Sequence, residues 1–180
     1  MSNIKIEIIA KGEILISRPE KFLINFSTTY EDIEKYFGKP YREKIGVLSY
    51  PDKKIEQKDI VFENPVIVLT YYNNILSMID IHRSMSLFYN DINLLAKPID
   101  KIVKDLDNIG IAHVYFDDIT ILFPKLNIFI NVVENELQNI GIYKDGYFDQ
   151  IKNDEIRYKL LNSKKENGIL TYYFDYKDKK

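Results

Sequence analysis

The chain has 180 residues, of which 46% are hydrophobic and 29% are charged, a composition typical of an ordinary globular domain. Its 27 acidic and 25 basic residues leave a net charge of -2, which is too small to favour a nucleic acid or an anionic membrane as a partner. The absence of cysteine excludes disulfides, thiolate zinc sites and cysteine nucleophiles, and two histidines are too few for a typical histidine metal centre.

The amino-terminal segment predicts three short strands. Residues 4–8 alternate apolar and charged side chains, Lys11-Gly12 is a turn signal, and isoleucines then recur at alternate positions, as in a hairpin. The run "KFLINFS" follows Pro19 and predicts a third strand beside a loop or at a sheet edge. A signal peptide would instead show a continuous apolar core of ~7–15 residues, and a spanning helix ~18 or more apolar residues. We therefore expect a cytoplasmic protein without a membrane partner.

The next segment predicts a helix, a loop and a hairpin. Thr28 and Glu31 form a capping-box pattern, and apolar residues at helical spacing predict a helix over residues 29–37 that ends at a glycine. Residues 41–64 are polar and mixed in charge, which predicts a long loop with room for one irregular strand. The run "VIVLTYYNNILSMIDI" predicts a second hairpin, because asparagine tolerates the positive φ that a tight turn at Asn73-Asn74 requires.

The remaining chain predicts two helices and several strands. Pro98 suits a first helical position, and the apolar stripe over residues 99–109 predicts an amphipathic helix. The runs "HVYF", "ITILF", "LNIFINVV" and "LQNIGIY" predict a meander of three or four antiparallel strands within residues 111–148. The tail predicts a helix near residues 153–162, a turn at Asn167-Gly168 and a final aromatic strand.

These elements predict an α+β fold, in which an antiparallel β-sheet of hairpins and a meander packs with two or three short helices. We expect a single domain over residues 1–180. Two segments share the order of a helix, a glycine stop, a polar connection and antiparallel strands. Two related halves, about 1–90 and 91–180, are therefore an open alternative.

His113, Asp117 and Asp118 are the residues that most resemble an active site. A histidine oriented by a carboxylate can act as a general base. In an extended strand, however, residues 113 and 117 lie about 13 Å apart at ~3.3 Å per residue, and two aspartates between strand runs are typical of a turn. We therefore favour a turn over a catalytic site.

The other polar groups are weaker candidates. His82 lies two residues after Asp80 on one face of a strand, where a solvent-facing polar edge is favoured over a functional histidine. Glu134 and Glu136 have the spacing of hard-cation ligands but lack the further positions of a calcium loop, so a solvated turn is favoured. The sequence has no nucleophile elbow, phosphate loop or dinucleotide fingerprint. We expect no catalytic residue, no metal site and no cofactor.

Aromatic residues are abundant, with 14 tyrosines and 10 phenylalanines. Tyrosine suits a recognition surface, because its ring supplies contact area and its hydroxyl supplies a hydrogen bond. Aromatic clusters lie at residues 71–72, 143–148 and 172–176. The last two clusters include or adjoin acidic residues. A tyrosine and acidic binding face is one interpretation. The alternative is that the tyrosines line the core and follow a codon bias toward adenine and thymine.

Two segments resemble known families. The segment "TTYEDIEKYFGKP" resembles the short helix and glycine-proline stop of β-lactamase-inhibitor-protein-like and outer-membrane-assembly-lipoprotein domains, in which a helix precedes a small antiparallel sheet. The pattern "KPIDKIVKDLDNIGI…DDITILF…LNIFINVV" is similar to small bacterial proteins that include toxin-immunity partners. The chain departs from the lipoproteins by having no cysteine to lipidate, and from the secreted inhibitor by having no disulfides. The resemblance implies a protein that binds another protein.

We expect a non-catalytic protein-binding module, most specifically a cytoplasmic immunity protein that neutralises a bacterial toxin by masking its active site. The expected partner is another protein, with acidic groups suited to a cationic nuclease, and the expected state is a monomer or weak homodimer. The expected partner-binding residues are Asp117, Asp118, Glu134, Glu136, Tyr143 and Tyr147. The alternatives are a small-molecule hydrolase with His82 or His113 as its acid-base group, and a structural subunit that self-associates through its sheet.

Overall fold

Two sheets and three helices form the computed structural model, which describes residues 4–134 and 136–177. The ten strands of the larger sheet follow the spatial order β10 (Val114–Tyr115), β11 (Thr120–Phe123), β12 (Ile128–Val133), β13 (Glu136–Tyr143), β7 (Ile75–His82), β6 (Val66–Tyr72), β5 (Lys54–Glu63), β4 (Arg42–Ser49), β15 (Ile169–Tyr176) and β14 (Tyr158–Glu166). The five strands of the smaller sheet follow the order β3 (Lys21–Ile24), β2 (Glu13–Ser17), β1 (Lys5–Ala10), β8 (Leu87–Tyr89) and β9 (Ile92–Asn93).

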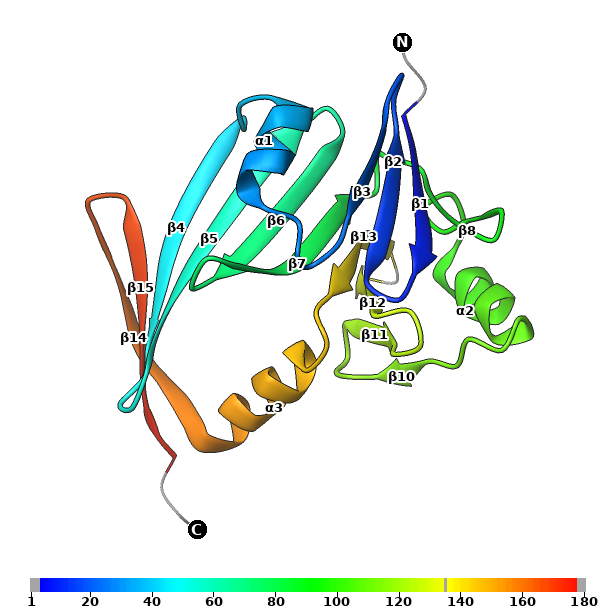
Figure 1. Cartoon of the computed structure of the whole chain (residues 1–180). Coiled ribbons are helices and arrows are strands. Elements are labelled where there is room, and N and C mark those ends of the chain that lie inside the picture. Colours follow the sequence, from blue (N-terminus) through cyan, green and yellow to red (C-terminus); the bar gives the residue numbers. More distant parts are fainter. Residues whose placement is uncertain (1–3, 135, 178–180) are drawn as a thin grey trace.

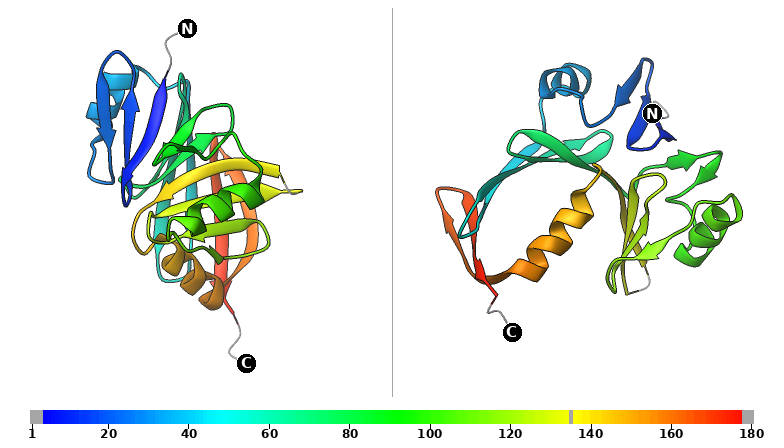
Figure 2. Two further views of the ribbon diagram at one scale, coloured as in Figure 1. Left: turned by 90° about the vertical axis from the view of Figure 1, so that its right-hand side faces the viewer. Right: turned by 60° about the horizontal axis from the view of Figure 1, so that its bottom comes forward.

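The larger sheet is curved, and helices lie on both of its sides (Figure 1). Helix α3 (Tyr147–Arg157) crosses the inside of the curve, whereas α1 (Tyr30–Phe37), α2 (Ile99–Asn108) and the smaller sheet lie outside it (Figure 2). We call the surface of the larger sheet toward α3 the inner face and the opposite surface the outer face.

The outer face carries the main hydrophobic core. On the two central strands β7 and β13, the buried residues Ile79, Ile81, Ile140 and Ile142 point to this side, because alternate residues of a strand face opposite ways. Helices α1 and α2 and the smaller sheet complete the cluster with Ile33, Ile102, Leu106, Ile6, Ile14 and Ile16. Burying one such side chain is worth about 1.5–3 kcal/mol, so this cluster dominates the stability of the fold.

The inner face is mixed in character. Met78 packs there against a smaller buried cluster of Leu122, Phe129 and Tyr143, together with Phe148 of α3. The positions beside this cluster are polar, as described below. The inner face therefore holds α3 by an aromatic contact at one end and leaves polar groups and space along the rest.

Local sequence signals correctly predicted the positions of several helices, strands and turns. The side chain of Thr29 accepts a hydrogen bond from the backbone N–H of Asp32, one position after the predicted cap at Thr28, and α1 ends at Gly38 with φ 81°. Asn73 and Asn74 turn between β6 and β7 with φ values of 48° and 63°. The predicted helix after Pro98 and the antiparallel meander from β10 to β13 are also confirmed.

The predicted loop over residues 41–64 is wrong, since this segment forms the long hairpin of β4 and β5. Its apolar residues change sides along β5. Ile60 and Phe62 belong to the outer core, whereas Ile55 lines a cavity on the inner face. Because strand prediction depends on one apolar face with a period of two, this change of side hid the strand.

The predicted helix near residues 153–162 is also wrong in position. Helix α3 begins at Tyr147, directly after the left-handed Gly146, and ends at Arg157, so that Tyr158–Glu166 form strand β14. Backbone pairing to β15 overrides the helical spacing of the apolar residues that follow α3. The turn at Asn167-Gly168 is confirmed by φ values of 49° and 83°.

The predicted fold class holds at the level of α+β, with strand as the dominant element. Two strand pairs in the described chain are parallel, β1 with β8 and β15 with β4, so the sheets are largely antiparallel, as predicted, but mixed. No helix within the described ranges is long and apolar enough to cross a membrane.

Candidate functional site

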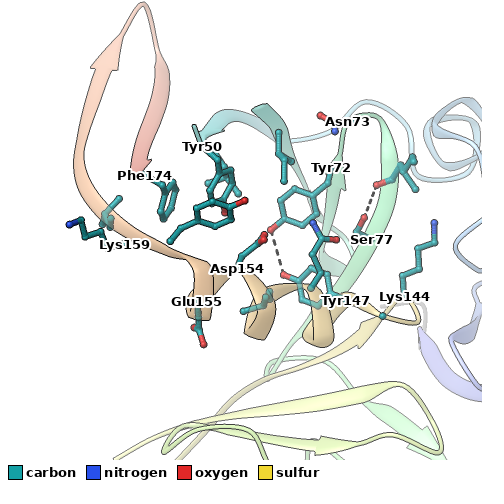
Figure 3. Close-up of a pocket in the computed structure, with 18 of the residues that line it drawn as sticks. Tyr50, Tyr72, Asn73, Ser77, Lys144, Tyr147, Asp154, Glu155, Lys159 and Phe174 are labelled. Atoms are coloured by element: carbon teal, nitrogen blue, oxygen red, sulfur yellow. Dashed lines mark hydrogen bonds between the residues drawn. The ribbon is translucent and has the colours of Figure 1, made fainter. Parts of the chain in front are cut away.

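A cavity of about 860 Å³ lies on the inner face, between α3, the sheet and the β14–β15 hairpin. Five aromatic residues contribute to its lining: Tyr50, Tyr72, Tyr147, Tyr158 and Phe174. Figure 3 shows the side chains of Tyr50, Tyr72, Tyr147 and Phe174 around one space. The volume falls within the ~300–1,000 Å³ typical of ligand pockets. We call this space the inner cavity.

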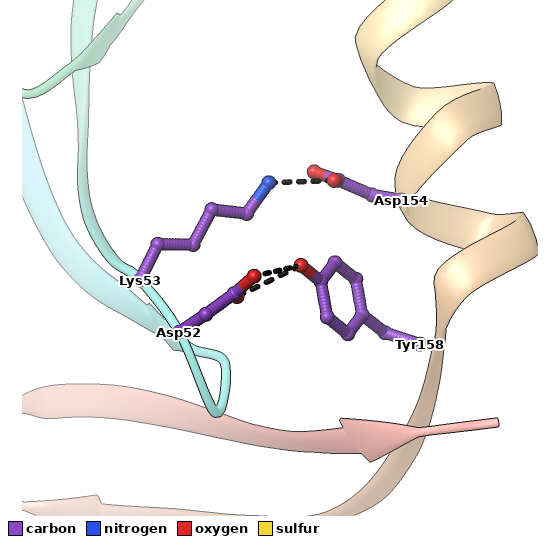
Figure 4. A network of polar contacts seen from close by, with 4 residues as sticks. All are labelled: Asp52, Lys53, Asp154 and Tyr158. Atoms are coloured by element: carbon purple, nitrogen blue, oxygen red, sulfur yellow. Dashed lines mark hydrogen bonds and ion pairs between the residues drawn. The ribbon is translucent and has the colours of Figure 1, made fainter.

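The carboxy-terminal end of α3 is tied to the turn between β4 and β5. The ammonium group of Lys53 contacts Asp154 of α3 at 2.5 Å, and the hydroxyl of Tyr158 donates to the carboxylate of Asp52 at 2.8 Å (Figure 4). The side chain of Asp154 is only 14% exposed, so this ion pair is far better shielded from water than an ordinary surface pair. These contacts fix one end of the helix above the inner cavity.

An aromatic stack forms the wall at this end. The rings of Tyr50 and Phe174 stack with centroids 4.5 Å apart, and the ammonium of Lys53 lies 4.7 Å from the Tyr50 centroid. Burial, followed by the charge of Asp154, raises the pKa of Tyr50 to about 12. The hydroxyl of Tyr50 therefore stays protonated at neutral pH. This wall already accommodates one cation, which is the side chain of Lys53.

Two further tyrosines of the lining, Tyr72 and Tyr147, form a pair in the inner cavity. The hydroxyls of Tyr72 and Tyr147 lie 3.5 Å apart, and their rings stack with centroids 6.0 Å apart. Burial is the largest cause of the raised pKa of each, and the charges of Asp59 and Asp80 raise both further. The charges of the two aspartates therefore act on the hydroxyl pair, although neither aspartate is among the residues that line the inner cavity.

The two aspartates belong to a polar network on the inner face. Asp80 of β7 accepts a hydrogen bond from the Asn139 side chain on β13, and Asn139 in turn accepts from Asn131 on β12. Asp59 of β5 accepts from the hydroxyl of Thr70 at 2.9 Å. The donors to both carboxylates are thus neutral groups.

The position of Asp80 changes its acidity. Burial raises its pKa to about 7, the hydrogen bond from Asn139 opposes this rise, and the charge of Asp59 adds to it. Gly141 lies opposite Asp80, and a Cβ atom there would lie 2.9 Å from the carboxylate and 2.2 Å from the ring of Phe129. The glycine therefore lets an aromatic ring and a carboxylate share this part of the inner face.

A second cavity, of about 490 Å³, lies on the outer side where α1 begins. Tyr30 and Tyr71 are among its lining residues, and the Tyr71 hydroxyl is buried without a hydrogen-bond partner in the described chain. Burial raises the pKa of Tyr71 to about 12. This space has fewer aromatic walls than the inner cavity and is the weaker candidate.

Four of the predicted partner-binding residues lie at one end of the meander. Asp117 accepts the backbone N–H of Ile119 at 2.9 Å and forms the expected turn with Asp118 between β10 and β11. Glu134 and Glu136 flank the turn between β12 and β13, at the same end, while Asn135 lies outside the described residues. Arg83 pairs with Glu136 at 3.3 Å. We call the four carboxylates of Asp117, Asp118, Glu134 and Glu136 the acidic end.

The structure does not join the two predicted tyrosines to the acidic end. Tyr143 is at the opposite end of β13 and is only 6% exposed, and it packs against Phe148. Tyr147 lines the inner cavity. The six predicted residues thus fall into two separate places, because β13 runs the length of the sheet between them.

The histidines make local contacts away from both cavities. His113 lies 3.1 Å from Asp107, not beside Asp117, and His82 contacts Ser84 at 3.0 Å, not Asp80. Neither histidine lines either of the two cavities. His82 is exposed, as expected for a solvent-facing position, but β7 lies between β13 and β6, so the strand is not at an edge of the sheet.

Sequence reasoning missed several residues of the inner cavity, namely Tyr50, Asp154 and Tyr158. The first lies in the segment interpreted as a loop, and the last two lie in the misplaced helix. A usable signal was the polar series on the side of β5 and β7 opposite the buried isoleucines, which includes Asp59 and Asp80. Polar residues at inward positions of central strands indicate a functional or ligand-facing surface.

Among the described residues, no group of three or more histidine, aspartate or glutamate side chains could hold a metal ion. No protein-family model matches this chain, and no curated protein or solved structure matches it significantly. The functional argument therefore depends on the geometry and chemistry of the site itself.

Proposed function

We propose that this protein is a non-catalytic binding protein that holds a segment of a partner protein in the inner cavity. The observation that carries the proposal is the aromatic lining of a cavity of about 860 Å³ between α3 and the curved sheet. Tyrosines are enriched at protein interfaces, because they bury a large area and keep a hydroxyl for a hydrogen bond. Tyr50, Tyr72 and Tyr147 have this role in the proposal.

The more specific role is that of an immunity protein of the bacterial cytoplasm, which neutralises a toxin by covering its active site. The resemblance to inhibitor-type and immunity-type proteins supports this role, and the absence of cysteine suits a reducing compartment. The acidic end, with Asp117, Asp118, Glu134 and Glu136, would attract a cationic toxin and orient it before the cavity engages.

The test is a pull-down of the tagged protein from a lysate of its own organism, with mass spectrometry of bound proteins at moderate salt. Gln150→Trp should fill the inner cavity, because Gln150 is an exposed residue of α3 that lines it. Lys152→Trp adds the same side chain to an exposed position of α3 that is not among the lining residues, and it serves as the matched control.

The expected result is one stoichiometric partner that Gln150→Trp loses and Lys152→Trp retains. If that partner is toxic when expressed alone and harmless when co-expressed, the immunity role is supported. Recovery of no partner, or equal recovery by both variants, would contradict binding through the inner cavity. Replacement of the four carboxylates of the acidic end by lysine is expected to slow association more than it speeds dissociation.

A further inference from the structure

The walls of the inner cavity are aromatic and aliphatic. The rings of Tyr50 and Phe174 stack with centroids 4.5 Å apart, and those of Tyr72 and Tyr147 stack with centroids 6.0 Å apart. Apolar walls favour an apolar side chain of a ligand, because the contact removes the surface of both from water. Four aliphatic residues complete these walls: Leu48, Ile55, Ile75 and Ile151.

The chain itself neutralises two of the carboxylates in the lining. Asp145 pairs with Lys11 at 2.7 Å and Asp154 pairs with Lys53 at 2.5 Å, and neither of these lysines is among the lining residues. Apart from these two pairs, the charged residues of the lining are one glutamate and three lysines, namely Glu155, Lys144, Lys159 and Lys177. Basic groups therefore outnumber acidic groups around the inner cavity.

Two of the lining lysines, Lys144 and Lys177, have ammonium groups that can meet a ligand. Both residues are exposed, and within residues 4–134 and 136–177 neither of them forms an ion pair. Their backbones are fixed, since the N–H of Lys144 donates to the carbonyl of Ser77 at 3.0 Å and the N–H of Lys177 donates to that of Arg157 at 2.9 Å. The lining thus provides two anchored positive charges.

The two lysines lie at opposite ends of α3. Lys144 comes shortly before the helix begins, and Lys177 is bonded to its last residue, Arg157. The 11 residues of α3 span about 16 Å at 1.5 Å per residue. Figure 3 shows Lys144 beside Ser77, on the side of the cavity away from Phe174. A positive charge therefore lies at each end, with aromatic walls between them.

We propose that the inner cavity binds an extended segment of the partner protein in which an apolar or aromatic side chain lies between two acidic side chains. The apolar side chain packs against the aromatic walls, and the two carboxylates pair with Lys144 and Lys177. In an extended chain, residues four positions apart project from one face and lie about 13 Å apart at ~3.3 Å per residue, a separation that lysine side chains can reach from the two ends.

This inference deepens the proposed function and rests on it for the source of the segment. It is compatible with a partner that has a basic surface elsewhere, because none of the four carboxylates of the acidic end lines the inner cavity. The acidic end would meet that basic surface, and the lysines of the inner cavity would meet the acidic segment. The two contacts together would fix the orientation of the partner.

The experiment uses the peptide acetyl-Asp-Ser-Phe-Ser-Asp-amide as the probe and acetyl-Asn-Ser-Phe-Ser-Asn-amide as its neutral control, each titrated at millimolar concentration into the full chain. Backbone amide shifts in NMR spectra report the site and the affinity. The expected result is saturable shifts at Tyr72, Tyr147 and Lys144 with the acidic peptide and binding about fivefold weaker with the neutral one. The affinity for the acidic peptide should fall as salt is added, since exposed charge pairs are screened.

Two double variants assign the site. Lys144→Gln with Lys177→Gln should fold, because both residues are exposed, and it should lower the affinity for the acidic peptide about fivefold while leaving that for the neutral peptide unchanged. Lys39→Gln with Lys152→Gln removes the same charge from exposed residues outside the lining and should change neither affinity. Equal binding of the two peptides, no binding of the acidic peptide, or full affinity in the Lys144 and Lys177 variant would overturn the inference.

The two proposals fail separately. If the acidic peptide binds as expected but no partner is recovered from the lysate, the preference of the cavity for an acidic segment stands and the partner-binding function does not. If a partner is lost by Gln150→Trp but retained at full affinity by the Lys144 and Lys177 variant, the function stands and the inference about the acidic segment is wrong.

Discussion

At the scale of single residues, Asp80 illustrates how the position of a side chain sets its acidity. It lies on a central strand, and its neighbours on the inner face are an amide, a second carboxylate and two tyrosine hydroxyls. The raised pKa has burial as its largest cause, because a carboxylate that has lost water without gaining a cation partner is disfavoured in its charged form. This buried carboxylate therefore lowers the stability of the folded protein at neutral pH.

We expect Asp80→Asn to stabilise the free protein at neutral pH. The folded chain holds the Asp80 proton up to about pH 7, whereas the unfolded chain releases it near the ordinary value of 3.8, so this group lowers stability as pH rises from about 4 to about 7. The variant removes that loss and should raise the free energy of unfolding at pH 8 by roughly 1–3 kcal/mol, since one pKa unit corresponds to about 1.4 kcal/mol.

Urea unfolding between pH 4 and pH 8 measures the effect, with Asp118→Asn as the comparison. The difference between wild type and Asp80→Asn should grow with pH and then level off near pH 8. A difference that is constant across this range would show that Asp80 titrates at its ordinary value in the folded protein.

Gly141→Ala is expected to destabilise the fold by roughly 1–3 kcal/mol, because the added methyl group meets the buried ring of Phe129 at 2.2 Å. Gly46→Ala on β4 is the matched control, since its methyl group meets its nearest atom at an ordinary 3.5 Å. Denaturant midpoints compare the two. Equal midpoints would mean that Phe129 moves aside freely and that the close approach has no structural role.

At the scale of elements, α3 is the least anchored helix. It has no fully buried residue, whereas α1 buries Ile33 and α2 buries Ile102 and Leu106. The helix is held at its ends instead, by Phe148 in the inner cluster and by the contacts of Asp154. Local stability follows buried contacts, so α3 should open more readily than the helices of the outer face.

We expect Lys53→Met to loosen α3. The variant removes the ammonium partner of Asp154, whose side chain is mostly shielded from water, and an unsatisfied buried group costs roughly 1–3 kcal/mol. Amide hydrogen exchange over Tyr147–Arg157 should become about tenfold faster, while α1 and α2 exchange as before. Lys164→Met removes an exposed ion pair and should change nothing in α3. Unchanged exchange in Lys53→Met would show that the ion pair does not hold the helix.

At the scale of the whole molecule, two hairpins of the larger sheet, β6–β7 and β12–β13, pair their strands in equivalent registers. Ile67 lies opposite Ile81 in β6–β7, and Ile128 lies opposite Ile142 in β12–β13, each 61 positions later. Both hairpins carry an irregularity at the equivalent place, after Thr70 and after Asn131. A common origin of residues about 1–90 and 91–180 stays a proposal. The shared register supports a relation between the β6–β7 and β12–β13 hairpins, but its offset of 61 positions is smaller than the 90 positions that separate the starts of those halves.

The halves are nevertheless joined closely enough that we expect neither to fold alone. Strand β13 pairs with β7 over five residue pairs, and β1 pairs with β8, so both sheets draw on distant parts of the chain. Fragments 1–90 and 91–180, expressed separately, should be unfolded by circular dichroism, and the whole chain should unfold in one transition. An independently folded fragment would contradict the single-domain prediction.

The sequence by itself determined the elements that depend on neighbours along the chain. Alternating apolar residues predicted β1, β2 and β12, the cap and glycine stop predicted α1, and the runs on either side of Asn73-Asn74 predicted the hairpin of β6 and β7, because period and turn chemistry are local properties. It also drew attention to Asp80 and to Tyr72 and Tyr147, although without bringing them together.

Only the tertiary structure decided the parallel pairings, the curvature and the inner cavity. The contacts that define the cavity join residues far apart in sequence, such as Lys53 with Asp154, 101 positions on, and Asp52 with Tyr158, 106 positions on. No local pattern encodes such a meeting, because it depends on how the β14–β15 hairpin pairs with β4. For the same reason, Tyr50 of the predicted loop and Asp154 and Tyr158 of the misplaced helix line one cavity.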